Sequence, residues 1–89
     1  MEPYVVQFLD EALDDLRRLD RNVASRILRR LEWLRNNFDA VAPEALTGWF
    51  AGLCKLRVGD YRVIYQPDRV RRILFVHAVG HRKDVYRQP

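Results

Sequence analysis

Three cations lie on a short stretch, KLRVGDYRVIY, whose other residues alternate like those of a β-hairpin. Lys55 and Arg57 precede the dipeptide Gly59-Asp60, and Arg62 follows it. Glycine at the first turn position favours a two-residue type II′ turn, which places Arg57 directly opposite Arg62. Like charges at opposed positions destabilise a sheet by a few tenths to about 1 kcal/mol. The pair therefore favours a binding site for an anion, with phosphate as the first candidate.

A purely structural explanation of the pair stays open. Carboxylates from elsewhere, such as Asp60, Asp68 or Asp84, can neutralise the arginines, or both heads can spread into water. The charge of the region favours the anion site instead. Residues 52–89 hold nine Lys and Arg against three Asp, a net charge of +6, whereas residues 1–51 have a net charge of −2. A positive field of this kind attracts phosphate backbones or an acidic protein partner.

The C-terminal stretch VGHRKDVYRQP adds groups that can transfer protons. His81 has an ordinary pKa of about 6.5, Arg82 is a permanent cation, and the Tyr86 phenol can donate or accept a proton. His81 as an idle surface residue and Tyr86 as a packing aromatic remain the alternatives. His77 lies inside an apolar run and is interpreted as a core or sheet-face histidine. With no carboxylate cluster and no convincing metal ligands, we expect neither a metal ion nor another cofactor.

This set of groups suits cleavage of RNA by its own 2′-hydroxyl. An enzyme must take the proton from that hydroxyl, stabilise the extra negative charge on the phosphate and protonate the leaving 5′-oxygen. Arginines serve the second task. Like charges around Lys55 disfavour its charged form, which makes it a conceivable base. Tyr86 or His81 is the candidate acid.

The preceding segments predict the frame that positions these groups. A strand is expected over residues 4–9, followed by two helices whose apolar stripes run over 9–19 and 24–34. Asp10 is the expected N-cap of the first helix, Asp20 or Asn22 that of the second, and Asn36-Asn37 ends it. The very short connection predicts an antiparallel helical hairpin.

The second half of the chain predicts a sheet. Residues 38–52 suit a connection with one short edge strand, and strand-like runs follow over 53–58, 61–66 and 73–79. The turns are expected at Gly59-Asp60, and at Pro67-Asp68 with the charged residues after it. The order predicts an α+β fold, an antiparallel sheet of four to five strands packed on the N-terminal helical hairpin. Strand alternation sorts the faces. The expected core face carries Cys54, Leu56, Val58, Tyr61, Val63 and Tyr65, and the opposite face carries Lys55, Arg57, Arg62 and Gln66.

Some aromatic and basic residues have two possible roles. Trp49 and Phe50, between two glycines, either stack on bases or close the edge of the core. The arginines of the second helix form a solvated face or lie on RNA.

Length and composition bound the class of protein. Eighty-nine residues make one domain, and the apolar and charged fractions, 48% and 31%, are typical of a globular chain. No apolar run approaches the roughly 20 residues that cross a bilayer, and the N-terminus does not look like a signal peptide, so we expect a cytoplasmic protein without membrane association. A single cysteine, Cys54, excludes an internal disulfide framework.

The chain resembles the RelE/ParE superfamily of bacterial toxin-antitoxin toxins, on its RelE-like side. The motifs LRVGDYRVIY and VGHRKDVY, in this order and at this distance from the C-terminus, carry the resemblance, which extends back to Tyr4-Val5-Val6. It implies one RelE-like toxin domain over residues 1–89 with a microbial ribonuclease-like fold. It also implies a metal-independent endoribonuclease that enters the ribosomal A site and cleaves messenger RNA. A cognate antitoxin is expected to inhibit it within a toxin-antitoxin hetero-oligomer.

The resemblance also implies roles for individual residues. The expected catalytic residues are Arg62, Arg82, Tyr86 and Lys55, and the expected RNA-binding residues are Arg57, His81, Lys83 and Arg87. Two departures from the family pattern concern the base: Leu53 stands where a second lysine is found, and the tail between Arg82 and Tyr86 is shorter. His81 is expected to fill part of that gap. Trp33, off the main apolar stripe, makes either a satellite contact or an antitoxin contact.

Other functions remain open from the sequence. One alternative is a ParE-like inhibitor of DNA gyrase, and another is a degenerate homologue that only binds an antitoxin. A general nucleic-acid-binding module is the third, with affinity for RNA that falls steeply with salt and no cleavage.

Overall fold

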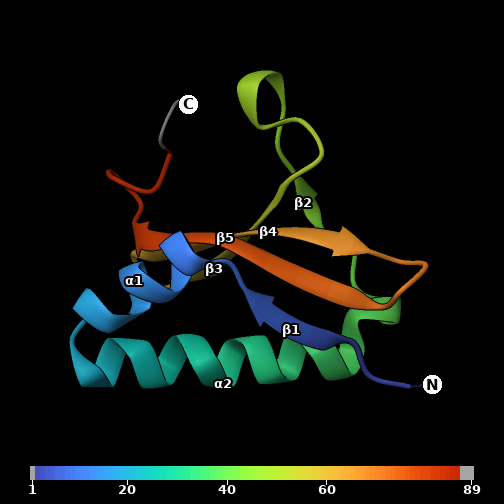
Figure 1. Ribbon diagram of the computed structural model, residues 1–89, viewed down its shortest axis with the longest axis horizontal. Helices are drawn as coiled ribbons and strands as arrows, with labels where there is room; N and C mark the ends of the chain where they lie inside the picture. Colours follow the sequence, from blue (N-terminus) through green and yellow to red (C-terminus); the bar gives the residue numbers. More distant parts are fainter. Residues whose placement is uncertain (1, 87–89) are drawn as a thin grey trace.

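A five-stranded sheet is covered on one face by two helices, while a long loop projects from the other face (Figure 1). The computed structural model describes residues 2–86. The elements are β1 (Val5–Phe8), α1 (Asp10–Arg18), α2 (Arg21–Asn37), β2 (Glu44–Ala45), β3 (Cys54–Val58), β4 (Tyr61–Asp68) and β5 (Ile73–His81), with short 3-10 turns η1 (Phe38–Ala40) and η2 (Gly48–Phe50). The strand order is β1-β5-β4-β3-β2. Within residues 2–86, neither helix is long and apolar enough to cross a membrane.

The predicted α+β architecture is confirmed. Three of the four neighbouring strand pairs are antiparallel, and the two-residue strand β2 is the predicted short edge strand. The first strand, β1, instead runs parallel to the last, β5. The first and last strands of the chain therefore lie side by side, and β1 and β2 form the two edges of the sheet.

The helix ends differ in part from the prediction. Asp10 is the first residue of α1, and Leu9 occupies the N-cap position without a capping side chain. The predicted cap at Asp10 is therefore wrong, although a carboxylate in the first turn still favours the helix through its dipole. Asp20 is the N-cap of α2, but its side chain makes no capping hydrogen bond. The helix ends at Asn37, as expected.

The core lies between α2 and the sheet. Ile27, Leu31 and Leu34 of α2 are buried against the face of the β3–β4 hairpin that alternation predicted. On that face Cys54, Leu56, Val58, Val63 and Tyr65 are buried and Tyr61 is half-buried. Because successive strand residues point to opposite sides, the cations of the hairpin lie on the face away from α2.

The β3–β4 hairpin has the predicted register. Arg57 pairs with Arg62, and Val58 pairs with Tyr61 across the turn. Gly59 has φ +60°, the left-handed value that a type II′ turn requires at its first position. The sequence pattern of the hairpin is therefore sufficient to place its side chains on the correct faces.

The turn predicted at Pro67-Asp68 and the charged residues after it is confirmed at the charged residues only, because Pro67 and Asp68 both belong to β4. Pro67 pairs with Leu74 of β5, and β4 has by then extended past Tyr65, the last residue paired with β3. With no strand on that side, the missing N–H of proline costs no ladder hydrogen bond. The turn follows at residues 69–72, where the Asp68 carboxylate accepts a hydrogen bond from the Arg71 N–H at 2.9 Å.

A buried carboxylate of α1 completes the hydrogen bonding of β5. Strand β1 pairs with β5 only as far as Val76. Beyond that point Asp15, with 4% of its surface exposed, accepts a hydrogen bond from the Val79 N–H at 3.0 Å. Arg18 lies 3.8 Å from the same carboxylate. The side chain of α1 thus takes the place of a strand partner, and β5 continues to His81.

Replacing this carboxylate tests its structural role. Asp15→Ala leaves the Val79 N–H without its acceptor and should lower the free energy of unfolding by about 1–3 kcal/mol. Asp14→Ala is the matched control, because Asp14 is exposed on the same helix and, within residues 2–86, forms an ion pair with Arg17 alone, at 3.6 Å. It should change the free energy by less than about 0.5 kcal/mol. Urea unfolding followed by circular dichroism measures both, and equal effects would contradict the assignment.

Candidate functional site

Two of the three hairpin cations share one carboxylate. Glu44 of β2 lies opposite Lys55 in the β2–β3 pair. Its carboxylate is 3.6 Å from the Lys55 Nζ and 3.2 Å from the Arg57 Nε. The neutralising acid is therefore Glu44 and none of the three aspartates that the sequence suggested; Asp68 pairs with Arg71 instead. One negative charge between two cations leaves a net positive charge on this part of the face.

Arg62 is held by the turn and not by an acid. Its Nη1 donates to the carbonyl oxygens of Gly59 and Tyr61, at 2.8 and 2.9 Å. Within residues 2–86 no carboxylate forms an ion pair with it. The two opposed arginines avoid each other because Arg57 turns to Glu44 and Arg62 turns to the backbone. Arg62 keeps its full charge, and its Nε and Nη2 donors remain for a ligand.

The chain after β5 folds back over the same face as Arg62. The Arg82 N–H donates to the Asp60 carbonyl at 2.8 Å, which ties the tail to the β3–β4 turn. Val85, 2% exposed, packs on Gly80: a Cβ on that glycine would lie 3.7 Å from the Val85 Cβ. Gly80 pairs with Arg62 in the β4–β5 ladder. Residues 82–86 and Arg62 therefore share one side of the sheet.

The candidate proton-transfer groups lie in this tail. The Tyr86 ring is partly exposed and meets the Phe50 ring edge to face, with centroids 5.7 Å apart. The half-buried His81 ring meets Tyr61 in the same way at 5.6 Å. Its Nδ1 accepts a hydrogen bond from the Lys83 N–H at 3.3 Å. In the neutral ring the proton then sits on Nε2, so His81 presents a donor on its other side.

His81 pairs with Tyr61 and therefore points to the α2 side of the sheet, whereas the other described site residues form two groups on the opposite face. Lys55 and Arg57 converge on Glu44 near the β2 edge, whereas Arg62 and the tail with Arg82, Lys83 and Tyr86 gather about the β3–β4 turn and the end of β5. Arg82 and Lys83 are exposed, and in the described part of the chain neither has an acidic partner. Arg87 lies outside the described residues.

Sequence reasoning missed one basic residue at the turn. The Arg26 guanidinium of α2 lies against Gly59, where an added Cβ would come within 2.6 Å of Nη2. The φ value of Gly59 favours glycine at this position, whereas the flexible end of the Arg26 side chain could move away from an added Cβ. The helical pattern gave no sign of this contact, because it depends on how α2 crosses the sheet.

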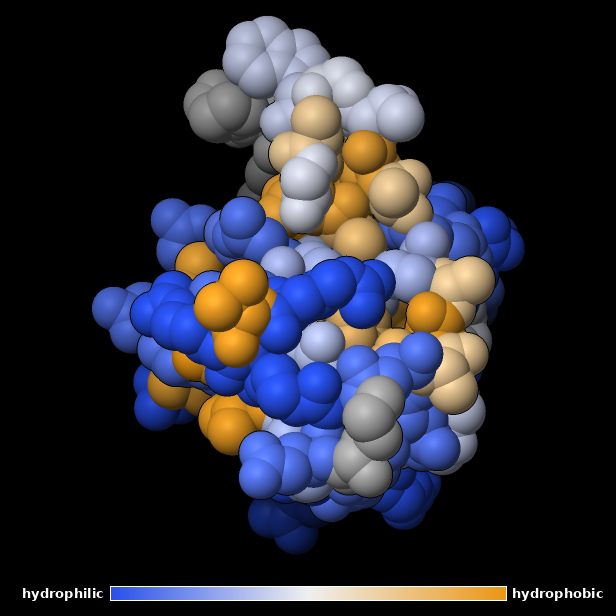
Figure 2. Space-filling view, turned by 90° about the vertical axis from the view of Figure 1, so that its right-hand side faces the viewer, coloured by the Kyte–Doolittle hydropathy of each residue, from blue (hydrophilic) through white to orange (hydrophobic). Residues whose placement is uncertain are grey.

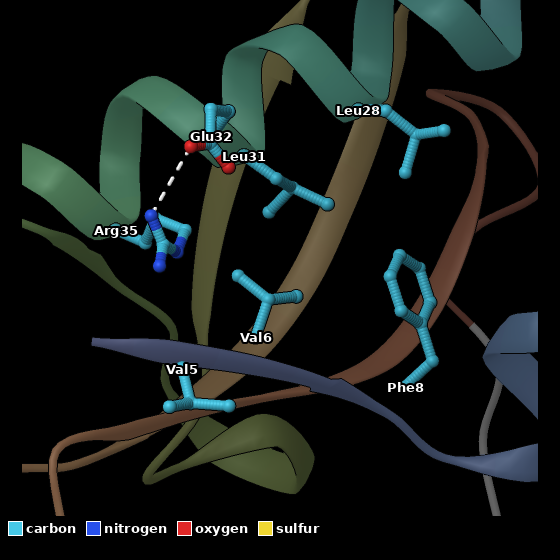
Figure 3. A pocket seen from close by; sticks show the side chains of 7 residues that line it. All are labelled: Val5, Val6, Phe8, Leu28, Leu31, Glu32 and Arg35. Carbon is cyan, nitrogen blue, oxygen red and sulfur yellow. Dashed lines mark hydrogen bonds and ion pairs between the residues drawn. The ribbon is translucent and has the colours of Figure 1, made fainter. Parts of the chain in front are cut away.

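A groove opens on the helical side, between α2 and the edge strand β1, and is lined by apolar side chains and by the Glu32–Arg35 ion pair (Figure 3). Its volume is about 360 Å³, and Val6, Phe8, Leu28 and Leu31 point into it. Val5 and Leu28 are 57% and 46% exposed. This surface is separate from the basic face and is suited to apolar side chains of another molecule.

The second histidine is confirmed as a sheet-face residue. His77 is half-buried, with its Nε2 3.2 Å from the Gln66 Oε1 across the β4–β5 pair. Burial lowers the pKa of His77 below its ordinary value. Its neutral ring is therefore part of the folded structure and not of the basic site.

The His77 pKa shift predicts a loss of stability in mild acid. The folded-state pKa lies below the unfolded value of about 6.5, so the unfolded chain binds more protons between the two values. Stability is fully present above about pH 6.5 and is lost as the pH falls toward the folded-state pKa. His77→Gln should reduce the difference between urea midpoints measured at pH 7.5 and pH 5. An unchanged difference would contradict this origin.

Removing the shared carboxylate should strengthen polyanion binding. Glu44→Gln frees both Lys55 and Arg57, so the protein should elute from heparin at higher salt. Glu32→Gln removes the same charge from α2, where Glu32 forms an ion pair with Arg35 at 3.1 Å away from the basic face, and is the matched control. Loss of either exposed pair should cost less than about 1 kcal/mol of stability. Equal elution of the two variants would show that Glu44 does not control the charge of the face.

Comparisons with known proteins agree with this arrangement. The family described as the ParE toxin of the type II toxin-antitoxin system parDE matches residues 6–86. Toxin RelG of Mycobacterium tuberculosis is 27% identical over 86 residues, which cover 97% of this chain and 99% of RelG.

Solved structures show the same fold. The toxin-antitoxin complex RelBE2 of Mycobacterium tuberculosis contains a chain with TM-score 0.79 and 26% identity, covering 89% of this chain and 98% of that one. A mutant of the Escherichia coli toxin RelE in the free state gives TM-score 0.72 and 26% identity, covering 89% and 83%. The family match spans almost the whole chain, including both segments that form the basic face. The chain therefore belongs to the ParE toxin family of type II toxin-antitoxin systems, within the RelE/ParE superfamily.

Proposed function

We propose that the protein is a metal-independent endoribonuclease that cleaves messenger RNA in the ribosomal A site. The observation that carries the proposal is Arg62, which has no acidic partner in the described residues and shares a sheet face with the tail that bears Tyr86. The relatives named RelG and RelE place the chain among RelE-like toxins in fold and sequence. We also propose a cytoplasmic location, where its substrate is found.

In this mechanism the 2′-hydroxyl attacks the adjacent phosphate, and the 5′-oxygen leaves. Arg62, aided by Arg82, stabilises the charge that grows on the phosphate oxygens. Tyr86, which lies on the same face as Arg62, gives a proton to the leaving oxygen. Lys55 leaves Glu44 and gives up its own proton to solvent, and the neutral amine then takes the proton of the attacking hydroxyl. The distance of 3.6 Å between the Lys55 Nζ and the Glu44 carboxylate is longer than a charge-assisted hydrogen bond of about 2.8 Å, so Lys55 leaves only a weak contact.

A cognate antitoxin is the proposed protein partner. Solved relatives include the toxin-antitoxin complex RelBE2. The groove between α2 and β1 offers apolar side chains, and the basic face offers Arg62, Arg82 and Lys83, which have no acidic partner within residues 2–86. A flexible antitoxin segment with apolar and acidic residues can fold onto both surfaces. The two proteins would then form a hetero-oligomer in which the toxin is inactive.

Messenger cleavage by the antitoxin-free protein tests the proposed activity. In a bacterial translation extract, primer extension should reveal cuts within translated codons. Arg62→Ala should reduce the rate by about 10²- to 10³-fold, as for loss of one group that stabilises developing charge. Tyr86→Phe, which removes only the phenol, should also slow cleavage. Arg69→Ala is the matched control, since Arg69 lies beyond the opposite end of β4, over the Phe38 ring.

The family match to ParE toxins favours one competing function, inhibition of DNA gyrase. A gyrase poison should trap cleaved DNA in a supercoiling assay, and Tyr86→Phe should leave this effect unchanged. Intact messenger with wild-type protein, together with trapped DNA, would replace the ribonuclease proposal by this one. Intact messenger without trapped DNA would indicate a homologue that only binds its antitoxin.

A further inference from the structure

The loop between β2 and β3 projects from the sheet on the side away from α2 (Figure 1), and it contains an exposed tryptophan. Trp49 at its tip is 72% exposed. Residues 45–53 contain no charged side chain. Figure 2 shows the loop as the projection at the top, pale to orange above a mostly blue body. Trp49 therefore does not close the edge of the core, which was one of its two sequence-based interpretations.

The backbone of the loop is internally bonded, so the exposed position of Trp49 is built into the fold. The Leu46 N–H donates to the Leu53 carbonyl at 2.9 Å and closes the loop. Within it, the Phe50 N–H donates to the Thr47 carbonyl at 3.2 Å. Gly48 and Gly52, on either side of the aromatic pair, have φ values of +64° and +91°, which other residues rarely adopt.

The loop touches the candidate site through the neighbouring aromatic residue. Phe50 packs edge to face on Tyr86, the candidate acid. The other end of the loop leads directly into β3, which carries Lys55 and Arg57. A neutral aromatic projection thus stands beside a cationic sheet face. Sites for single-stranded nucleic acid combine these two elements, a charged surface for the backbone and an aromatic platform for the bases.

The two tryptophans of the chain differ in how available their rings are. Trp33 on α2 is also exposed, but the Arg30 guanidinium lies 4.8 Å from its ring centroid and covers one face. In the part of the chain that the structure describes, no aromatic ring or cation packs on Trp49. Trp49 is thus the more exposed of the two tryptophans, and within residues 2–86 no ring or cation covers it.

We propose that Trp49 is a stacking platform for an unpaired base of the RNA strand whose phosphate lies at Arg62. The inference rests on the proposed function, because it takes RNA as the ligand of the basic face. The loop then determines which nucleotide next to the scissile bond is held, and Phe50 fixes the loop relative to Tyr86.

Single-tryptophan variants test the platform by fluorescence. Trp33→Phe leaves Trp49 as the reporter, and Trp49→Phe leaves Trp33. The probe is a single-stranded 2′-O-methyl RNA oligomer at low salt, which can bind but lacks the attacking hydroxyl. Quenching is expected in the Trp33→Phe variant and not in the Trp49→Phe variant. Absence of quenching at Trp49, or equal quenching in both variants, would overturn the proposal.

Affinity for the same oligomer gives a second measurement. Trp49→Ala should weaken binding about 5- to 150-fold, as expected for loss of one stacked base, and Trp49→Phe should retain most of the affinity. Trp33→Ala is the control and should bind like wild type. If Trp49→Ala binds RNA normally and loses only antitoxin affinity, the loop is a protein contact and the proposal is wrong.

The outcomes separate this inference from the ribonuclease proposal. RNA that is bound with quenching of Trp49, while translated messenger stays intact, would remove the cleavage function and keep the platform. Messenger cut normally by Trp49→Ala, with unchanged oligomer affinity, would remove the platform and keep the cleavage function.

Discussion

The buried Asp15 carboxylate accepts a backbone hydrogen bond that a neighbouring strand would otherwise accept. Strand β1 is too short to pair with the second half of β5, and Asp15 of α1 accepts the Val79 hydrogen bond there. This bond lets β5 run on to His81 before the chain turns back. Gly80 then faces Arg62, Val85 packs on Gly80, and Tyr86 follows. The C-terminal half of the candidate site is therefore positioned from the first helix, far away in sequence.

The repulsion between the cations of the β3–β4 hairpin is reduced in two different ways. Glu44 partly neutralises Lys55 and Arg57, whereas the carbonyl dipoles of the β3–β4 turn hold Arg62 without cancelling its charge. A carboxylate next to Arg62 would have stabilised the free protein and competed with a phosphate. The electrostatic repulsion between Arg57 and Arg62 is thus reduced by a counter-charge at Arg57 only. Arg62 keeps its full charge beside the C-terminal tail.

The hairpin was predictable from the sequence because its determinants are local. Gly59 sets the turn, and strict alternation then fixes register and faces, so Arg57 and Arg62 could be paired in advance. The error at Pro67 came from a nonlocal fact, namely that β3 ends before β4 does. Glu44 was missed because a two-residue strand has no periodicity to recognise. Contacts between distant elements, such as Phe50 with Tyr86, leave no mark in the pattern at all.

The positive charge of the basic face depends on whether strand β2 stays paired. This strand contributes only two residue pairs, Glu44 with Lys55 and Ala45 with Cys54, so its detachment requires less free energy than opening any longer strand of the sheet. Each such fraying event also withdraws the counter-charge that Glu44 supplies. Detachment of β2 and the positive potential of the basic face are thereby thermodynamically coupled. A polyanion that binds the form with β2 detached shifts the population toward that form. The ordered edge strand, conversely, disfavours nonspecific binding of nucleic acid.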